Sequence, residues 1–326
     1  MLPYNNKNQS SKHIIMKKNI LTFFILFIFF LMLAKMDLTR TYALKGLNLW
    51  LFSVLPTLLP YTIISSILLR IDAFSKPLIK IRQLTKINFN EHIPFIIICG
   101  IFCGCPIGAK LSADTYKLNK INKRTAVFLL CSLSSLSPAF IINFALPVIL
   151  PIKLRIMLFI LIIISNVISA YIIIHIFNIK DNSSNPSSLP YDAIINQKKN
   201  RIHLTDIFES CILSSFEIQV KIGGYIIIFS CISGIFIQTL HLTPYYALIF
   251  NSILEISSGL GTYNVFQPSK KYISLITALT SFGGICTICQ ISSCIKDVNI
   301  PKSCLLYSKL ISAILIYILT YILLNV

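Results

Sequence analysis

The sequence has few charged residues for its length. Asp, Glu, Lys and Arg make up 12% of the 326 residues, whereas a soluble domain carries about a quarter. The shortage falls in long apolar runs, and the mean hydropathy is +0.78. These values exclude an ordinary soluble protein. They predict an all-α polytopic membrane protein, because a bilayer core needs about 20 helical residues to cross it.

The short alternating strands of a membrane β-barrel are also missing. Backbone groups in lipid must be satisfied within their own segment, so the apolar runs are predicted to be helices. We find nine hydrophobic segments, of which six or seven are expected to cross fully. The long runs are 20–34, 47–69, 125–146, 156–177, 212–237 and 305–324, and the shorter or broken ones are 93–111, 245–260 and 272–289.

Acidic residues are scarce, with 11 Asp and Glu against 29 Lys and Arg and a net charge of +18. In a soluble protein this balance would suggest nucleic acid. Here the basic residues cluster in short connections, as the positive-inside rule expects. No aromatic-plus-basic RNA motif accompanies them. The predicted partner is therefore the lipid bilayer and not nucleic acid.

The first apolar run follows Lys12, Lys17 and Lys18, as a signal peptide would. No clean small-residue cleavage motif comes after it, and further apolar runs follow. We therefore expect an uncleaved first helix.

Signatures of catalysis and of metal binding are absent as well. The sequence has no Ser-His-Asp order, Walker loop or dinucleotide fingerprint. The Cys286-x-x-Cys289 spacing could be a redox or metal pair, but no His or further Cys completes a site beside it. Most of the ten cysteines lie in apolar segments, where Cys usually behaves as a small hydrophobe. We expect neither an enzyme nor a cofactor nor a metal site.

A polar stretch containing Asn182–Ser188 is the one real linker and divides the membrane part into two. The predicted organisation is a cytoplasmic N-terminal tail at 1–18, a first membrane half at 19–177, a polar linker at 178–206 and a second membrane half at 207–326.

Segment 93–111 lies between two basic stretches, 70–92 and 117–124. If both are cytoplasmic, the segment enters and leaves on the same side. Five helix breakers interrupt it, namely Pro94, Gly100, Gly104, Pro106 and Gly108. Breakers inside a short span favour a re-entrant hairpin, with a short kinked span as the alternative.

The two halves show a weak internal repeat. The stretch 104–110 and the stretch 284–290 are each followed by a polar stretch and an apolar helix, which places Lys110 and Gln290 at equivalent positions. Repeats that carry broken helices at matching places point to a transporter-like site. The sequence leaves open whether the halves are inverted or parallel.

Glu255 is the sharpest single candidate for that site. No Lys or Arg lies within ten residues of it. A carboxylate at membrane depth needs a partner from another helix, a proton, a cation or a ligand. Ser257 and Ser258 add hydroxyl groups beside it. A purely structural role for Glu255 is the alternative.

Two further pairs, Lys110 with Asp114 and Glu217 with Lys221, have i,i+4 spacing and so share a helix face. They either line a polar site or form ion pairs near the membrane surface. Ser137, Pro138, Gly283 and Gly284 interrupt helices and either expose polar groups to a ligand or pack helices together. The full candidate set is Gly104, Pro106, Gly108, Lys110, Asp114, Ser137, Pro138, Glu217, Lys221, Glu255, Ser257, Ser258, Gly283, Gly284 and Gln290.

Five motifs occur in one order over about residues 45–325: Gly104–Lys110, Ser137–Phe140, Ile222–Tyr225, Leu254–Leu260 and Ser281–Gly284 with Gln290. Together they resemble the YlbJ-type sporulation integral membrane proteins, which carry a nucleoside-recognition (gate) domain. The sequence departs from that family at Cys105, where an aromatic is usual, and at Ser134 and Ser135, where an Asn pair is usual.

The resemblance implies two gate-like halves with broken or re-entrant helices in a bacterial cell membrane. It implies a multi-pass protein of the mother-cell or forespore membrane that is needed for spore cortex formation. It also implies distant kinship with nucleoside and ferrous-iron transporters, and hence a small polar or nucleoside-like substrate, with other sporulation membrane proteins as partners. The predicted function is a transporter-like or channel-like permease, and the alternative is a non-transporting scaffold that recruits cortex-synthesis partners.

Overall fold

The computed structural model describes residues 5–71, 90, 92–146, 149–180, 204–260, 269–296 and 298–324. Every regular element in these ranges is a helix, and none is a strand. The prediction of an all-α protein is therefore confirmed.

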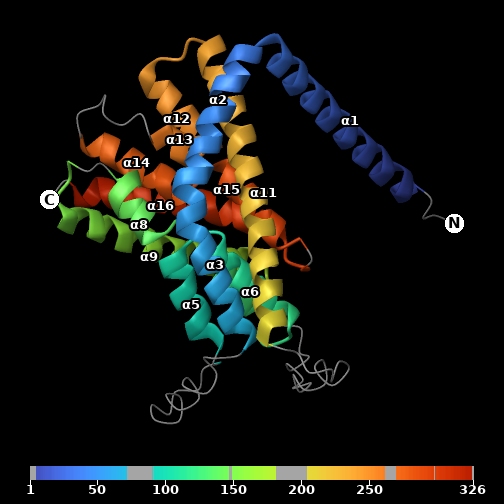
Figure 1. Ribbon diagram of the computed structural model, residues 1–326, viewed down its shortest axis with the longest axis vertical. Helices are drawn as coiled ribbons and strands as arrows, with labels where there is room; N and C mark the ends of the chain where they lie inside the picture. Colours follow the sequence, from blue (N-terminus) through green and yellow to red (C-terminus); the bar gives the residue numbers. More distant parts are fainter. Residues whose placement is uncertain are drawn as a thin grey trace.

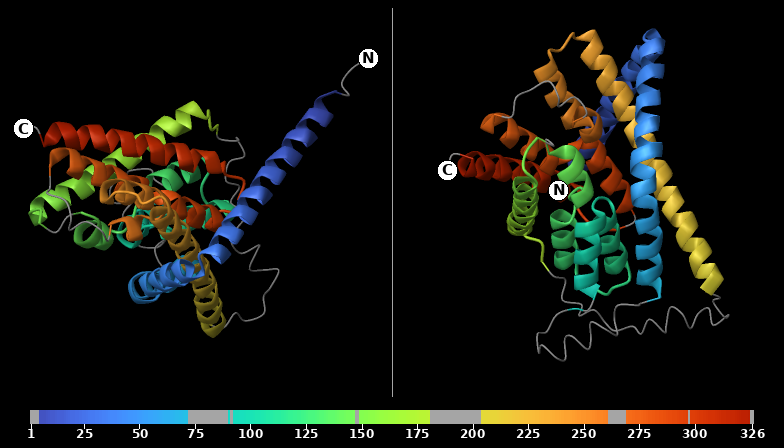
Figure 2. Two further views of the ribbon diagram at one scale, coloured as in Figure 1. Left: turned by 90° about the horizontal axis from the view of Figure 1, so that it is seen from above. Right: turned by 60° about the vertical axis from the view of Figure 1, so that its left-hand side comes forward.

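The first half opens with a long rod of 35 residues. It consists of α2 (Met36–Leu49), the π-helical turn η1 (Trp50–Val54) and α3 (Leu55–Arg70). The three elements follow one another without a break and form one continuous helix. The helix before it, α1 (Asn5–Ala34), projects away from the rest of the molecule (Figures 1 and 2).

A hairpin follows the rod. Helix α5 (His92–Cys103) and helix α6 (Ile107–Lys117) are separated by a sharp break. Asn90, just before α5, donates from Nδ2 to the Lys120 carbonyl just after α6 at 2.6 Å. Because the two ends of the segment meet, the chain turns back on itself here. The predicted hairpin shape is confirmed, and the alternative of a single kinked span is wrong.

The next predicted span, 125–146, is broken. Its parts are α7 (Lys123–Ser132), the short α8 (Pro138–Phe140) and the π-helical turn η2 (Ile141–Ala145), with a non-helical stretch at 133–137. Pro138 has no N–H to donate and suits the first turn of a helix, so the chain restarts there. The unbroken helix α9 (Ile152–Ile176) completes this half.

The second half contains the same kinds of element in the same order. Its chain reverses at Glu255, where Gly259 lies against Ser252, and it breaks again at Gly283 and Gly284, whose φ angles are 77° and 83°. The helices are α11 (Leu204–Thr239), α12 (Pro244–Leu254), α13 (Ile256–Leu260), α14 (Lys270–Phe282), α15 (Gly284–Cys294) and α16 (Lys302–Leu323).

The halves correspond element by element. The rod α2–α3 matches α11, the hairpin α5–α6 matches the reversal α12–α13, the broken α7–η2 matches α14–α15, and α9 matches α16. The matching helices that pack together run antiparallel. Ser165 on α9 bonds Ser312 on α16 at 3.2 Å, and Ser169 bonds Ser308 at 2.9 Å. The repeat is therefore inverted, which the sequence had left open.

This correspondence differs from the one expected from the sequence. The break at Gly104 matches Glu255 and not Gly284, so Lys110 and Gln290 are not equivalent. Once α9 is matched with α16, a short sequence likeness becomes visible. The stretches Ser165-Asn166-Val167-Ile168-Ser169-Ala170 and Ser308-Lys309-Leu310-Ile311-Ser312-Ala313 agree at four of six positions.

The largest apolar core lies where the hairpin and α7 meet the end of α15 and the start of α16. Its members include Ile96, Leu111, Leu130, Ile291 and Leu305, all of them buried. Since these residues come from both halves, the core holds the halves together.

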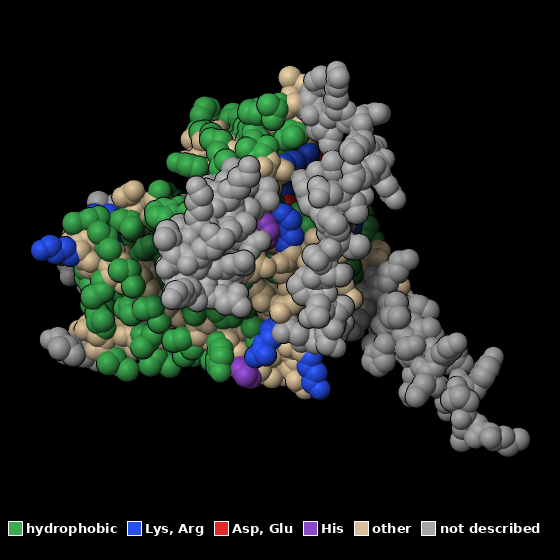
Figure 3. All heavy atoms as spheres, turned by 90° about the horizontal axis from the view of Figure 1, so that it is seen from below, with side chains coloured by type: hydrophobic (Ala, Val, Ile, Leu, Met, Phe, Trp, Pro, Cys, Tyr) green, Lys and Arg blue, Asp and Glu red, His purple; other side chains and the backbone are tan. Residues whose placement is uncertain are grey.

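Five helices are long and apolar enough to cross a membrane: Met36–Arg70, Ile152–Ile176, Leu204–Thr239, Lys270–Cys294 and Lys302–Leu323. Large apolar side chains such as Ile160 and Ile322 lie on their outer surfaces, and Figure 3 shows apolar side chains over much of one end of the molecule. The chain is a multi-pass membrane protein. Of the predicted linker, residues 181–203 lie outside the described ranges, as does most of the basic stretch 70–92.

Candidate functional site

A cavity of about 390 Å³ lies where the broken helices of the two halves meet. The first half contributes Cys105 from the hairpin tip and Ser137 from the break after α7. The second half contributes Glu255 from its chain reversal and Thr287 and Gln290 from α15. The remaining wall residues are Leu49, Phe52, Ser53, Val54, Thr57, Leu58, Leu136, Ala139, Phe140, Phe144, Ile222, Ile226, Ile256 and Ser257.

In the first half, the hairpin tip rests directly on the next break. The backbone N–H of Cys105 donates to the Ser135 carbonyl at 2.6 Å. Gly104 has a φ of 72°, and a Cβ on it would collide with the backbone of Ser137. Only glycine combines that left-handed conformation with so close an approach. The position therefore holds Cys105 and Ser137 side by side on the cavity wall.

In the second half, the corresponding contact lies between the reversal at Glu255 and Gly284. A Cβ on Gly284 would lie 3.1 Å from the Ser252 carbonyl oxygen and 3.3 Å from the backbone nitrogen of Ile256. Each half thus places its chain reversal against its second break, and the cavity lies between the two contacts.

The Glu255 carboxylate is buried and caps the start of α13. Its Oε1 accepts from the backbone N–H of Ser257 at 3.0 Å, and its Oε2 accepts from the Ser258 N–H at 2.6 Å and from the Ser258 hydroxyl. A partner from another helix was expected for this carboxylate. Its observed partners come instead from the turn that follows it in the chain. Two carboxylate oxygens offer about four acceptor positions. One therefore remains for a group in the cavity.

Gln290 is the second polar group from this half that faces the cavity. Its Nε2 donates to the sulfur of Cys286 at 3.2 Å. A thiol sulfur is a weak acceptor, so this bond leaves the amide able to rotate toward a ligand. Ser137 is held more firmly, since its hydroxyl accepts from the Phe140 N–H at 3.3 Å as the N-cap of α8.

Both π-helical turns border the cavity. Turn η1 supplies Phe52 and Ser53 to the wall, and η2 supplies Phe144. Such turns in otherwise α-helical segments are frequent at functional sites. Trp50 anchors η1, because its Nε1–H donates to the Gln219 carbonyl at 3.0 Å.

A second cavity of about 390 Å³ adjoins the first and shares Leu49, Phe144 and Ser257 with it. It extends along α11 past Ser230 and Ser233. In the other direction along α11, the buried side chains of Ser215 and Gln219 hydrogen-bond no group in the described part of the chain. The inward face of α11 therefore carries polar groups on both sides of the cavity, as a route for a polar molecule requires.

Four of the predicted site residues lie elsewhere. The ammonium of Lys110 donates to the Ser66 hydroxyl at 3.4 Å, between α6 and α3. Glu217 and Lys221 form an exposed ion pair at 2.5 Å on the outside of α11. These residues therefore do not line the cavity between the breaks, because i,i+4 spacing shows that two residues share a face but not where the face points.

Asp114 is the fourth of these residues and lies on the same hairpin leg as Lys110. Burial raises the pKa of its carboxyl group and outweighs the opposite effect of Lys110, Lys117 and Arg70. Asp114 lies near the C-terminal end of α6, toward the end of the molecule where the hairpin begins and ends.

The other predicted residues are at the breaks or support them. Gly104, Pro106, Pro138, Gly283 and Gly284 form the breaks themselves. Gly108 packs within the hairpin, where a Cβ would lie 2.8 Å from the Cα of Gly100. Ser257 lines both cavities, and the Ser258 hydroxyl also bonds Ser230 at 3.3 Å.

Sequence reasoning missed Lys309. Its side chain is buried in the middle of α16, and its ammonium donates to the carbonyls of Ser134 and, at 3.2 Å, Ser281. Lys309 lies inside the predicted apolar span 305–324. An ionisable residue at membrane depth is a candidate for a functional site, so the reasoning applied to Glu255 applies equally to Lys309.

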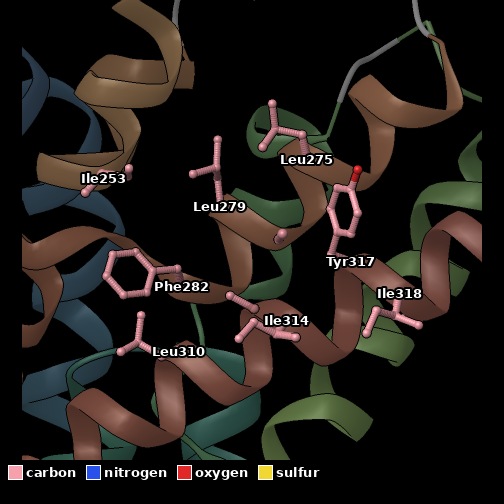
Figure 4. Close-up of a pocket in the computed structure, with 10 residues that line it drawn as sticks. Ile253, Leu275, Leu279, Phe282, Leu310, Ile314, Tyr317 and Ile318 are labelled. Carbon is pink, nitrogen blue, oxygen red and sulfur yellow. The ribbon is translucent and has the colours of Figure 1, made fainter. Parts of the chain in front are cut away.

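A third cavity, also of about 390 Å³, differs in chemistry. It lies between α14 and α16, where Leu275, Leu279 and Phe282 face Leu310 and Ile314 (Figure 4). The side chains that line it are apolar, and the hydroxyl of Tyr317 is the one polar side-chain group among them. The polar cavity between the breaks is therefore the candidate site.

No group of three or more His, Cys, Asp or Glu side chains in the described ranges could hold a metal ion. Cys286 and Cys289 are both free thiols. In chemical terms, the cavity offers one carboxylate, one amide, several hydroxyls and three phenylalanine rings, which together suit reversible binding of a small molecule. No protein-family model, no curated protein and no solved structure matches the chain.

Proposed function

We propose that the chain is a membrane permease that binds a small polar molecule in the cavity between its broken helices. One observation carries the proposal: two inverted halves each place a chain reversal against a helix break, and Cys105, Ser137, Glu255 and Gln290 from these elements surround one cavity. Sites of secondary transporters are built in this way, at the interface of inverted repeats and from discontinuous helices.

The cavity wall also limits the substrate. Among the described residues of its wall, Glu255 carries the one carboxylate, and none is Lys or Arg. A buried anion without a cation repels other anions. The substrate is therefore neutral or positively charged. Phe52, Phe140 and Phe144 add flat apolar surface, which favours a molecule that joins a planar or apolar part to hydrogen-bonding groups.

The resemblance to YlbJ-type proteins extends the proposal to the cell. On this proposal, the permease lies in the mother-cell or forespore membrane of an endospore former and serves spore cortex formation. The motifs at Gly104–Lys110 and Leu254–Leu260 that support this resemblance contain the two chain reversals that border the cavity.

The test uses purified protein in lipid vesicles and a panel of neutral, cationic and anionic polar molecules, nucleosides included. Two variants change the cavity: Glu255→Gln removes the charge, and Ala139→Trp fills the space from an exposed position on its wall. Glu217→Gln is the matched control, since it removes a carboxylate from the exposed pair on α11.

We expect uptake of at least one neutral or cationic compound by the wild-type protein. Ala139→Trp should abolish it, and Glu255→Gln should weaken binding roughly 10- to 100-fold, as the loss of a charged hydrogen bond would. Glu217→Gln should behave as wild type. If Ala139→Trp and Glu255→Gln form normal spore cortex while charge reversal at 117–124 does not, the permease is wrong and the scaffold takes its place.

A further inference from the structure

Lys309 lies at a meeting point of the two halves, away from the walls of the polar cavity. Its ammonium bonds the Ser134 carbonyl, just beyond the end of α7, and the Ser281 carbonyl, in the last turn of α14. These helices are counterparts in the inverted repeat. One side chain therefore joins the equivalent breaks of the first and the second half.

Both carbonyls that Lys309 bonds lie at helix ends: that of Ser281 belongs to the last turn of α14, and that of Ser134 to the non-helical stretch that follows α7. The last carbonyls of a helix have no partner within the helix, and the helix dipole makes that end negative. Two such ends that converge inside an apolar protein require a cation or strong donors. In the described part of the chain, the Lys309 ammonium makes no ion pair with a carboxylate. Its charge is therefore balanced by the two helix ends.

The surroundings hold Lys309 in place. Ser308 and Ser312, one residue before and three residues after it on α16, bond Ser169 and Ser165 on α9. The Ser312 hydroxyl also bonds the Ser281 hydroxyl, and it donates to Asn166 Oδ1 at 2.8 Å. The helix that carries Lys309 is thus fixed by hydroxyl pairs on either side of the lysine.

We propose that Lys309 fills a monovalent-cation site formed by the ends of α7 and α14, and that its ammonium serves as a tethered cation that holds the breaks of the two halves together. Without the lysine side chain, the carbonyls of Ser134 and Ser281 will bind a free monovalent cation, either Na⁺ or a small primary ammonium ion. Lys309 acts as a positioning residue, and this inference does not depend on the substrate of the polar cavity.

The inverted repeat shows why the site is asymmetric. The counterpart of Lys309 on α9 is Asn166, which is buried as well. The Asn166 side chain carries no charge and is too short to reach the two breaks. Its Oδ1 accepts instead from the Ser312 hydroxyl on the facing helix α16. One lysine side chain, at one of the two equivalent positions, is enough to bond both breaks.

The experiment measures thermal unfolding of the detergent-purified protein with a thiol-reactive dye. Seven of the cysteines are buried and become reactive on unfolding. Wild type, Lys309→Ala and Lys302→Ala are compared in equal concentrations of choline chloride, NaCl and the chlorides of methyl- to butylammonium. Lys302 is the matched control, because it lies on the same helix and is exposed. Choline supplies charge without an N–H donor.

We expect wild type and Lys302→Ala to melt at the same temperature in all salts. Lys309→Ala should melt roughly 5–10 °C lower in choline chloride and should regain at least half of that loss in NaCl or in one of the alkylammonium salts. A Lys309→Ala protein as stable as wild type in choline chloride would overturn the proposal. So would a loss of stability that no cation restores.

Lys309→Asn covers the case in which Lys309→Ala does not fold. It places the counterpart side chain of Asn166 at this position and keeps a neutral donor. The proposal expects this variant to be destabilised in choline chloride and rescued by the same cations. A Lys309→Asn protein that matches wild type in every salt would show that the positive charge is not required.

Discussion

The two halves of the molecule share an architecture but not a chemistry. The first half reverses its chain at Gly104 and carries Asn166 at the middle of its last helix. At the corresponding places, the second half carries Glu255 and Lys309. Both buried charges that the fold brings to its centre therefore come from one half. The first half bonds Lys309 through the Ser134 carbonyl, whereas Glu255 is bonded by Ser257 and Ser258 of its own half.

The scaffold and the site therefore have separate requirements. An inverted scaffold needs breaks and reversals at equivalent places in both halves, and small or strongly kinking residues can supply them. A ligand site needs its charge only once, because a cavity between the halves is shared. Variants made at the breaks and at the buried contacts of the two halves should therefore have unequal effects.

The largest difference is expected between the glycines of the breaks. Gly104→Ala adds left-handed strain and a collision with the backbone of Ser137, and should destabilise the protein by about 4 kcal/mol. Gly283→Ala adds the strain alone, since a Cβ there would lie 3.6 Å or more from its nearest neighbours. It should destabilise by only about 1–2 kcal/mol. Thermal unfolding of both variants tests this, and equal melting temperatures would refute it.

An intermediate effect is expected at the contact that joins the halves, where the rod α2–α3 packs against α11. A Cβ on Gly223 would lie 2.6 Å from the ring of Trp50, whereas a Cβ on the adjacent Gly224 would meet nothing within 4 Å. Gly223→Ala should therefore destabilise by about 2 kcal/mol. Gly224→Ala should stabilise by up to about 1 kcal/mol, because Ala favours a helix. Loss of stability in both variants would mean that the packing of α11 is not as described.

The smallest effect is expected at Asn166. Its Nδ2 hydrogen-bonds no described group, and its Oδ1 is one of several partners of Ser312. Asn166→Leu removes one hydrogen bond and one unpaired donor, so stability should change by no more than about 1 kcal/mol in either direction. Lys309→Met, which leaves two buried carbonyls unpaired, should destabilise more. The melting temperatures of the two variants, measured side by side, give the comparison. A larger loss of stability in Asn166→Leu than in Lys309→Met would show that Asn166 contributes more to stability than Lys309 does.

Much of the fold could be predicted from the sequence because its signals are local. The length of an apolar run predicts a membrane helix, and the glycines and prolines at 100–108 between two basic stretches predict a hairpin. Ser137 and Pro138 likewise predict a new helix start, and the structure has one there. Each of these inferences depends only on residues close together in the chain.

The site was harder to predict because it depends on how faces turn and on which segments meet. Residues 245–260 look like one short apolar helix, and only the capping bonds of the Glu255 carboxylate show why the chain reverses there. The pairs at Lys110 and Glu217 have regular helical spacing, yet they point away from the cavity. Gly104 reverses the chain through a left-handed backbone conformation, whereas Glu255 reverses it by capping the next helix. Because the two reversals share no residue pattern, the correspondence of the halves was not visible in the sequence.

Trp50 has a practical consequence. It is the only tryptophan in the chain. Its indole packs on Gly223 at the contact between the halves, next to Ile222 and Ile226 of the cavity wall. The emission of an indole depends on its hydrogen bond and on the polarity around it. Intrinsic fluorescence of the unlabelled protein therefore reports any movement of one half against the other, so that binding and motion can be followed in real time without a probe.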